Sequence, residues 1–88
     1  MISRDFTISN SLGLHARPSA QLTQTAGKFQ SEVWIARNGR RVNAKSIMGV
    51  LMLAAGKGSV VTVDADGPDE AEAVAAVGAL IESGFGED

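Results

Sequence analysis

Apolar and polar residues alternate along four stretches of the chain, and this period of two predicts four β-strands. The first stretch covers residues 2–9, where alternate apolar side chains share one face. The other three cover residues 32–37, 40–43 and 60–64. Asn38-Gly39 separates the second stretch from the third, and this dipeptide is typical of a two-residue hairpin turn.

Apolar residues at helical spacing predict three α-helices. These helices cover residues 16–27, 47–55 and 69–83. The last one carries a clear apolar stripe formed by Ala73, Val74, Val77, Leu80 and Ile81. Gly27, Gly56 and Gly84 provide natural helix ends. The middle helix is apolar nearly all round, so part of it must be exposed unless another element covers it.

The predicted order of elements is β-α-β-β-α-β-α. Helices alternate with strands, yet one link is a tight hairpin, which favours an α+β sandwich with helices on one face of a sheet. The chain has 88 residues and contains no repeat or Pro/Gly-rich linker, so we expect a single domain over residues 1–88.

The composition excludes several classes of protein. No run of 18 apolar residues is present, which argues against a membrane span. The strand pattern starts at once, so we expect no signal peptide and a cytoplasmic location. The chain has no Cys and one His, which argues against disulfides and a structural zinc site, and we expect no metal.

The charge is distributed unevenly along the chain. Residues 1–57 contain all eight Lys and Arg and two acids, a net charge of +6, whereas residues 58–88 carry −8. The basic part lacks the interleaved aromatic residues that stack nucleic-acid bases, so we expect no nucleic acid as partner. Phosphate groups and acidic protein surfaces are the better expectation.

The candidate chemistry lies where the first strand pattern ends and the first helix begins. His15 is the only histidine, and Pro18 suits a first helical turn, which predicts His15 at the helix N-cap. The backbone N–H groups of Ala16 and Arg17 and the helix dipole then form an anion site, to which the Arg17 guanidinium adds charge. A neutral imidazole, with an ordinary pKa of about 6.5, could accept a phosphoryl group there.

Three other interpretations of this stretch remain open from the residues alone. His15 could be a solvated cap residue, which is the commoner role of a lone histidine at a loop–helix junction. The chain could be a small hydrolase of acyl phosphates that uses Arg17 as its anion clamp and survives His15→Ala. It could also be a regulatory binding module that keeps its partners without His15.

The sequence Gly-Leu-His-Ala-Arg-Pro at residues 13–18 resembles the active-site signature of the HPr family, the histidine-containing phosphocarriers of the bacterial phosphotransferase system. The segments at residues 44–49 and 54–58 and the closing helix resemble the family as well, so the resemblance covers nearly the whole chain. The ending Glu-Ser-Gly-Phe-Gly-Glu-Asp resembles the nitrogen-related branch, NPr, whereas Lys-Ser-Ile-Met-Gly resembles branches that carry a regulatory serine.

This resemblance implies an open-faced sandwich with a four-stranded antiparallel sheet in the order 1-4-2-3 and three helices on one face. It also implies that Nδ1 of His15 receives a phosphoryl group from Enzyme I and passes it to IIA-type domains, with Arg17 as phosphate partner and no cofactor. The protein would then be a phosphoryl-transfer intermediate in sugar uptake or nitrogen-related regulation rather than a stand-alone enzyme. We expect a monomer.

Regulation and docking are expected around the middle helix. Ser46 suits the N-cap of that helix, and the resemblance adds the alternative of a regulatory phosphoserine made by a serine kinase and removed by a phosphatase. The predicted partner-binding residues are Leu14, Ala20, Ile47, Met48 and Leu51. Met48 and Leu51 are the strongest candidates there, although a place in the core is equally compatible with their sequence context.

Overall fold

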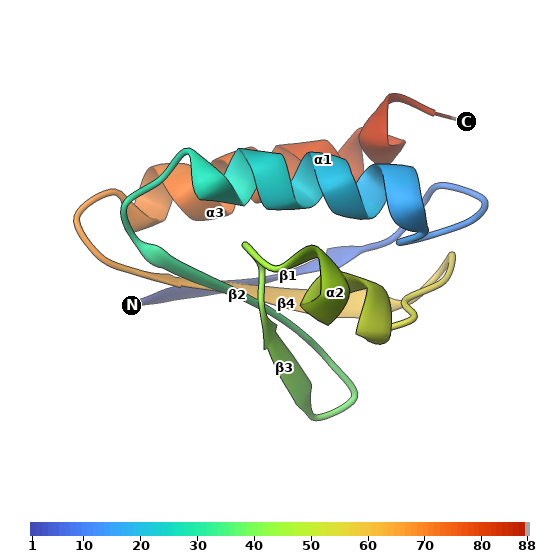
Figure 1. Cartoon of the computed structure of the whole chain (residues 1–88), viewed down its shortest axis with the longest axis horizontal. Helices are drawn as coiled ribbons and strands as arrows, with labels where there is room; N and C mark the ends of the chain where they lie inside the picture. The colour runs from blue at the N-terminus through green and yellow to red at the C-terminus, as the bar shows by residue number, and fades with distance from the viewer. Residues whose placement is uncertain (88) are drawn as a thin grey trace.

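A computed structural model describes residues 1–87 and shows a four-stranded antiparallel sheet with its helices packed on one face (Figure 1). The strands are β1 (Ile2–Thr7), β2 (Glu32–Arg37), β3 (Arg40–Asn43) and β4 (Val60–Asp66). The helices are α1 (Ala16–Gly27), α2 (Ile47–Met52) and α3 (Glu70–Glu82), followed by the short 3-10 turn η1 (Gly84–Gly86). The strand order β1-β4-β2-β3 confirms the α+β sandwich expected from the sequence.

Strand β4 lies in the middle of the sheet and pairs with both β1 and β2. Phe6 of β1 lies opposite Val61, and Ile35 of β2 lies opposite Val63. These residues all point to the helix-covered face, while the neighbouring positions on each strand are more exposed. Strand β3 forms one edge of the sheet and joins β2 through the predicted hairpin, in which Asn38 and Gly39 both have positive φ.

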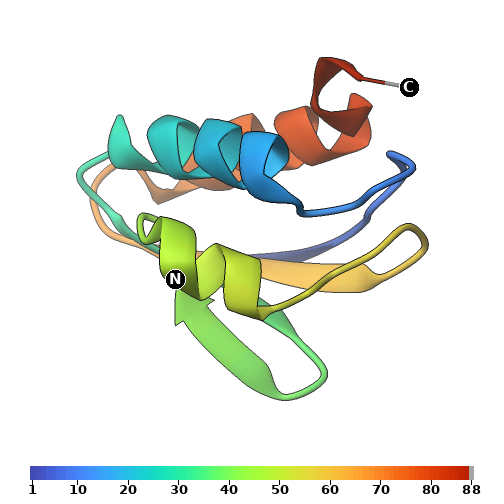
Figure 2. The same cartoon turned by 45° about the vertical axis from the view of Figure 1, so that its right-hand side comes forward.

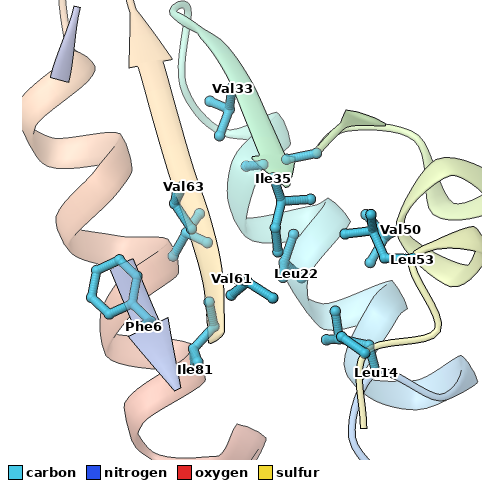
Figure 3. Close-up of a cluster of buried hydrophobic side chains, with 14 of the residues drawn as sticks. Phe6, Leu14, Leu22, Val33, Ile35, Val50, Leu53, Val61, Val63 and Ile81 are labelled. Atoms are coloured by element: carbon cyan, nitrogen blue, oxygen red, sulfur yellow. The ribbon is translucent and has the colours of Figure 1, made fainter. Parts of the chain in front are cut away.

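The core fills the space between the sheet and the helices. Figure 3 shows Val61 and Val63 of the central strand between Phe6 on one side and Leu22 of α1 on the other. The Phe6 ring fits against α3 at Gly78, where an added Cβ would lie 2.2 Å from the ring. None of the helices formed by residues 1–87 has the length and hydropathy that a membrane-spanning segment requires.

Several predicted boundaries were wrong by a few residues. Helix α2 ends at Met52 rather than at residue 55, because Ala54 takes a positive φ of 51° and turns the chain away. β1 ends at Thr7 rather than at residue 9, and β4 continues to Asp66 rather than ending at residue 64. The 3-10 turn after α3 was not predicted.

Two loops meet at one end of the molecule, where α1 begins. Ile8 N–H donates to Ser59 O at 2.9 Å, and Gly58 N–H donates to Ile8 O at 2.8 Å. Both views place the start of α1, the loop before it and the C-terminal segment at this same end (Figures 1 and 2). Residues distant in sequence are therefore brought together around His15.

Candidate functional site

His15 occupies the N-cap of α1, in extended backbone conformation with φ −79° and ψ −169°. Its carbonyl accepts the first helical bond, from Ser19 N–H at 3.0 Å. The N–H groups of Ala16 and Arg17 precede that bond, so they have no intrahelical acceptor. The site therefore presents two backbone donors and the positive end of the helix dipole beside the imidazole.

The loop that carries His15 packs closely against the segment after α2. Gly13 has φ +64°, and a Cβ at this position would lie 2.3 Å from Ala55 O. The next residue, Leu14, donates its N–H to the same carbonyl at 2.8 Å and buries its side chain in the core (Figure 3). This close approach fixes the backbone immediately before His15.

The imidazole of His15 is about one-third exposed and has different surroundings at its two nitrogens. Nε2 lies 2.9 Å from Oε1 of Glu87, and 36% of the His15 side chain is accessible. Within residues 1–87, Nδ1 has no hydrogen-bond partner. Glu87 was missed from the sequence, because an acid near the end of the chain carries no local signal of a contact with residue 15.

Arg17 lies exposed in the first turn of α1. In the part of the chain that the structure describes, its guanidinium forms no hydrogen bond or ion pair. The residues on the other side of the turn are buried: these are Pro18 and Ser19, and Ser19 Oγ donates to Leu14 O at 3.1 Å. The helix start is thus anchored on one side while the cation on the other side faces solvent.

Four large apolar side chains are exposed in the loop before α1 and in α2. They are Leu12, Ile47, Met48 and Met52, which we call the apolar surface; Met48 is 64% exposed and Met52 is 60% exposed. Leu12 belongs to the loop that contacts Ala55, and the other three belong to α2. Met52 and Leu12 were not among the predicted docking residues, although both are apolar residues in exposed positions.

The remaining predicted docking residues are less accessible. Leu14 is only 4% exposed, so its expected place on the docking surface was wrong. The Leu14 N–H donates to Ala55 O, which holds the backbone close to the core. Burial of the apolar side chain then lowers the free energy of the folded state. Ala20 and Leu51 are partly buried.

Ser46 is the N-cap of α2, as the sequence indicated. Its Oγ accepts a hydrogen bond from Gly49 N–H at 3.2 Å, which satisfies one of the free donors of the first turn. The side chain is partly exposed. Among residues 1–87, no three His, Asp or Glu side chains gather into a group that could hold a metal ion.

Comparisons with known proteins agree with the geometry of the site. Residues 2–83 match the family described as "PTS HPr component phosphorylation site". The chain is 66% identical to the phosphocarrier protein HPr of Cupriavidus necator over 87 residues, covering 99% of this chain and 98% of the relative. It is 55% identical to the HPr of Neisseria meningitidis serogroup A over 99% of this chain and 98% of that protein. The crystal structure of HPr-C-His from Thermoanaerobacter tengcongensis superposes with a TM-score of 0.96 at 49% identity, covering 100% of this chain and 99% of that one.

Proposed function

The chain belongs to the HPr family of phosphocarriers of the phosphotransferase system, which transfer phosphoryl groups through a histidine, and we propose that His15 is that histidine here. The observation that carries this proposal is the position of the only histidine, partly exposed at the N-cap of α1 beside two backbone donors and Arg17. A histidine that only caps the helix in solvent would not require an anion site and a cation beside it.

We propose that Nδ1 of His15 is the attacking atom. The lone pair on Nδ1 forms a bond to phosphorus while the bond between phosphorus and the donor breaks, and the donor keeps that electron pair. Nδ1 is the ring nitrogen nearer the backbone, so a phosphoryl group there lies closer to the N–H groups of Ala16 and Arg17. These donors and the Arg17 guanidinium stabilise the charge on the phosphoryl oxygens as transfer proceeds.

We propose Enzyme I as the donor and IIA-type domains as the acceptors, in the cytoplasm, as membership of the family implies. A carrier must bind both partners in turn with the same histidine. We propose that both partners dock on the apolar surface, whose two exposed methionines can adapt to partners of different shape. The exposed Arg17 guanidinium adds a positive charge two residues after His15.

Ser46 is proposed as a regulatory phosphorylation site that a serine kinase and phosphatase control. A phosphate at the start of α2 would add negative charge next to Ile47 and Met48. The backbone N–H groups of the first turn can donate to that phosphate, so phosphorylation should weaken partner binding and leave the stability of the fold nearly unchanged.

Phosphorylation by purified Enzyme I with labelled phosphoenolpyruvate tests the role of His15. The wild type should gain acid-labile, base-stable phosphate, and His15→Ala should gain none while keeping the thermal unfolding midpoint of a folded protein. A label that persists in His15→Ala would overturn the proposal. Release of phosphate from acetyl phosphate by the protein alone would instead support a hydrolase.

A further inference from the structure

The carboxylate of Glu87 contacts two residues between β1 and α1, Asn10 and His15, although Glu87 lies 72 residues from His15 in the chain. Its Oε1 lies 2.9 Å from Nε2 of His15 and accepts a hydrogen bond from Nδ2 of Asn10 at 3.0 Å. The same Nδ2 donates to Gly13 O at 2.8 Å, and Asn10 is completely buried. Asn10 therefore joins the carboxylate to the loop that positions the imidazole.

The turn after α3 brings Glu87 to this place. Gly84, Phe85 and Gly86 all have positive φ, so the chain leaves the helical path of α3 in a short left-handed turn. The Phe85 side chain is 3% exposed and belongs to the core, so this turn is anchored rather than free. Both views place the segment after α3 at the end of the molecule where α1 begins (Figures 1 and 2), and Glu87 N–H donates to Gly84 O at 3.1 Å.

A carboxylate can only accept hydrogen bonds, so its contact with Nε2 requires that Nε2 carries the proton. In the neutral ring, Nδ1 then holds the lone pair. A carboxylate or carbonyl that fixes one nitrogen of a histidine commonly determines what the other nitrogen can do. Without this contact the neutral ring could place its proton on either nitrogen and rotate about its side-chain bonds.

We propose that Glu87 is a positioning residue for phosphoryl transfer: it holds the Nε2–H tautomer and the ring orientation that leave Nδ1 free to attack. When the Nδ1–phosphorus bond forms and the donor leaves with its electron pair, the ring keeps the Nε2 proton and becomes positively charged. The Glu87 carboxylate faces that charge. This inference rests on the proposed role of His15.

Three variants separate positioning from a purely structural role of the C-terminal turn. Glu87→Ala removes the acceptor, and Glu87→Gln keeps an acceptor oxygen but removes the charge. Glu82→Gln is the matched control, because Glu82 is an exposed acid at the end of α3. In all three variants Phe85 remains in place to anchor the turn.

The first readout is the ¹⁵N spectrum of the neutral His15 ring in the unphosphorylated protein. The wild type and Glu82→Gln should show the Nε2–H tautomer with an Nε2 proton protected from exchange. Glu87→Ala should lose this protection and move toward the averaged shifts of free imidazole. Glu87→Gln should retain most of the protection. An unchanged ring spectrum in Glu87→Ala would overturn the proposal.

The second readout is the initial rate of phosphorylation by Enzyme I and phosphoenolpyruvate. Glu87→Ala should lose about tenfold, the scale of one charge-assisted hydrogen bond, and Glu87→Gln should lose less. Rates equal to that of Glu82→Gln would overturn the positioning role even if the ring spectrum changed. If instead the wild type gained no label on His15, the proposed function would fail, while the ring spectra would still report the Glu87 contact.

Discussion

At the level of single residues, the loop between β1 and α1 depends on a glycine. Gly13 has φ +64°, a conformation that costs other residues about 1–2 kcal/mol, and a Cβ at this position would lie 2.3 Å from the carbonyl oxygen of Ala55. Gly27 differs in both respects, since it lies in α1 and an added Cβ would meet nothing within 4 Å. The two positions form a natural pair for substitution.

Gly13→Ala should lower the free energy of unfolding by about 2 kcal/mol or more, because it adds backbone strain and a clash with a carbonyl that cannot move freely. Gly27→Ala should raise it by about 0.5–1 kcal/mol, because alanine loses less backbone entropy in a helix. Urea unfolding measures both changes. Equal stability of the wild type and Gly13→Ala would contradict the described loop.

Arg17→Ala should slow phosphoryl acceptance about tenfold, because it removes a charged partner of the phosphoryl oxygens. Its stability should stay within about 0.5 kcal/mol of the wild type, because Arg17 is exposed. Lys28→Ala is the control: it removes one positive charge just beyond the other end of α1. Similar losses in the two variants would indicate general electrostatics rather than a specific phosphate contact.

Local signals correctly predicted His15 at the N-cap of α1 and Arg17 in its first turn, because a strand ending, a glycine and an early proline lie within a few residues of each other. They could not reveal Glu87, since its contact depends on how α3 and the following turn fold back on the sheet. Leu14 illustrates the same limit. A leucine beside a loop glycine looks exposed in sequence, but its backbone bond to Ala55 places it in the core.

At the scale of elements, α2 shows how tertiary contacts set a helix boundary. The sequence after Met52 continues as Leu-Ala-Ala, which contains no helix breaker. Arg40 and Arg37 donate to the carbonyls of Met52 and Leu53 at 3.3 and 3.2 Å, so side chains from the β2–β3 hairpin satisfy the last carbonyl groups. The early end of α2 therefore depends on residues that are adjacent only in the fold.

Ser46→Asp should slow phosphoryl acceptance at His15 while stability changes little, because the aspartate can still accept from Gly49 N–H and adds negative charge beside the apolar surface. Ser46→Ala should accept phosphate normally and lose about 1 kcal/mol of stability with its cap. Rate assays with Enzyme I and thermal melts distinguish the two variants. Equal acceptance rates for the wild type and Ser46→Asp would refute the regulatory proposal.

Asp69 links the start of α3 to the segment before β2 through hydrogen bonds. Hydrogen bonds from the Ser31 hydroxyl and from the backbone N–H of Gln30 are the main reasons why the pKa of this carboxyl is below its ordinary value of 3.8. A carboxyl with a lowered folded-state pKa stabilises the fold above its unfolded pKa and loses that contribution as the pH falls through the folded pKa.

Asp69→Asn should therefore be less stable than the wild type near neutral pH, and its stability should fall less steeply than that of the wild type below the ordinary carboxyl pKa of 3.8. Urea unfolding between neutral pH and strong acid measures the two slopes. Glu72→Gln, at an exposed acid in the first turn of α3, is the control. Parallel curves for Asp69→Asn and the wild type would contradict this account.

At the scale of the whole molecule, the fold mixes charges that the sequence separates. The acidic part of the chain supplies β4, which lies between β1 and β2 of the basic part. Asp64 of β4 pairs with Arg41 at 3.2 Å on the open face of the sheet. Periodicity predicted the strands, but only resemblance to a family could supply their order, because strand pairing depends on contacts distant in sequence.

In the proposed mechanism, one nitrogen of His15 carries the phosphoryl group while the other keeps its proton. NMR of the ¹⁵N-labelled, phosphorylated protein tests it most directly. The ring should show coupling between phosphorus and Nδ1 together with a proton on Nε2. Phosphorus on Nε2, or on any residue other than His15, would overturn the proposed mechanism.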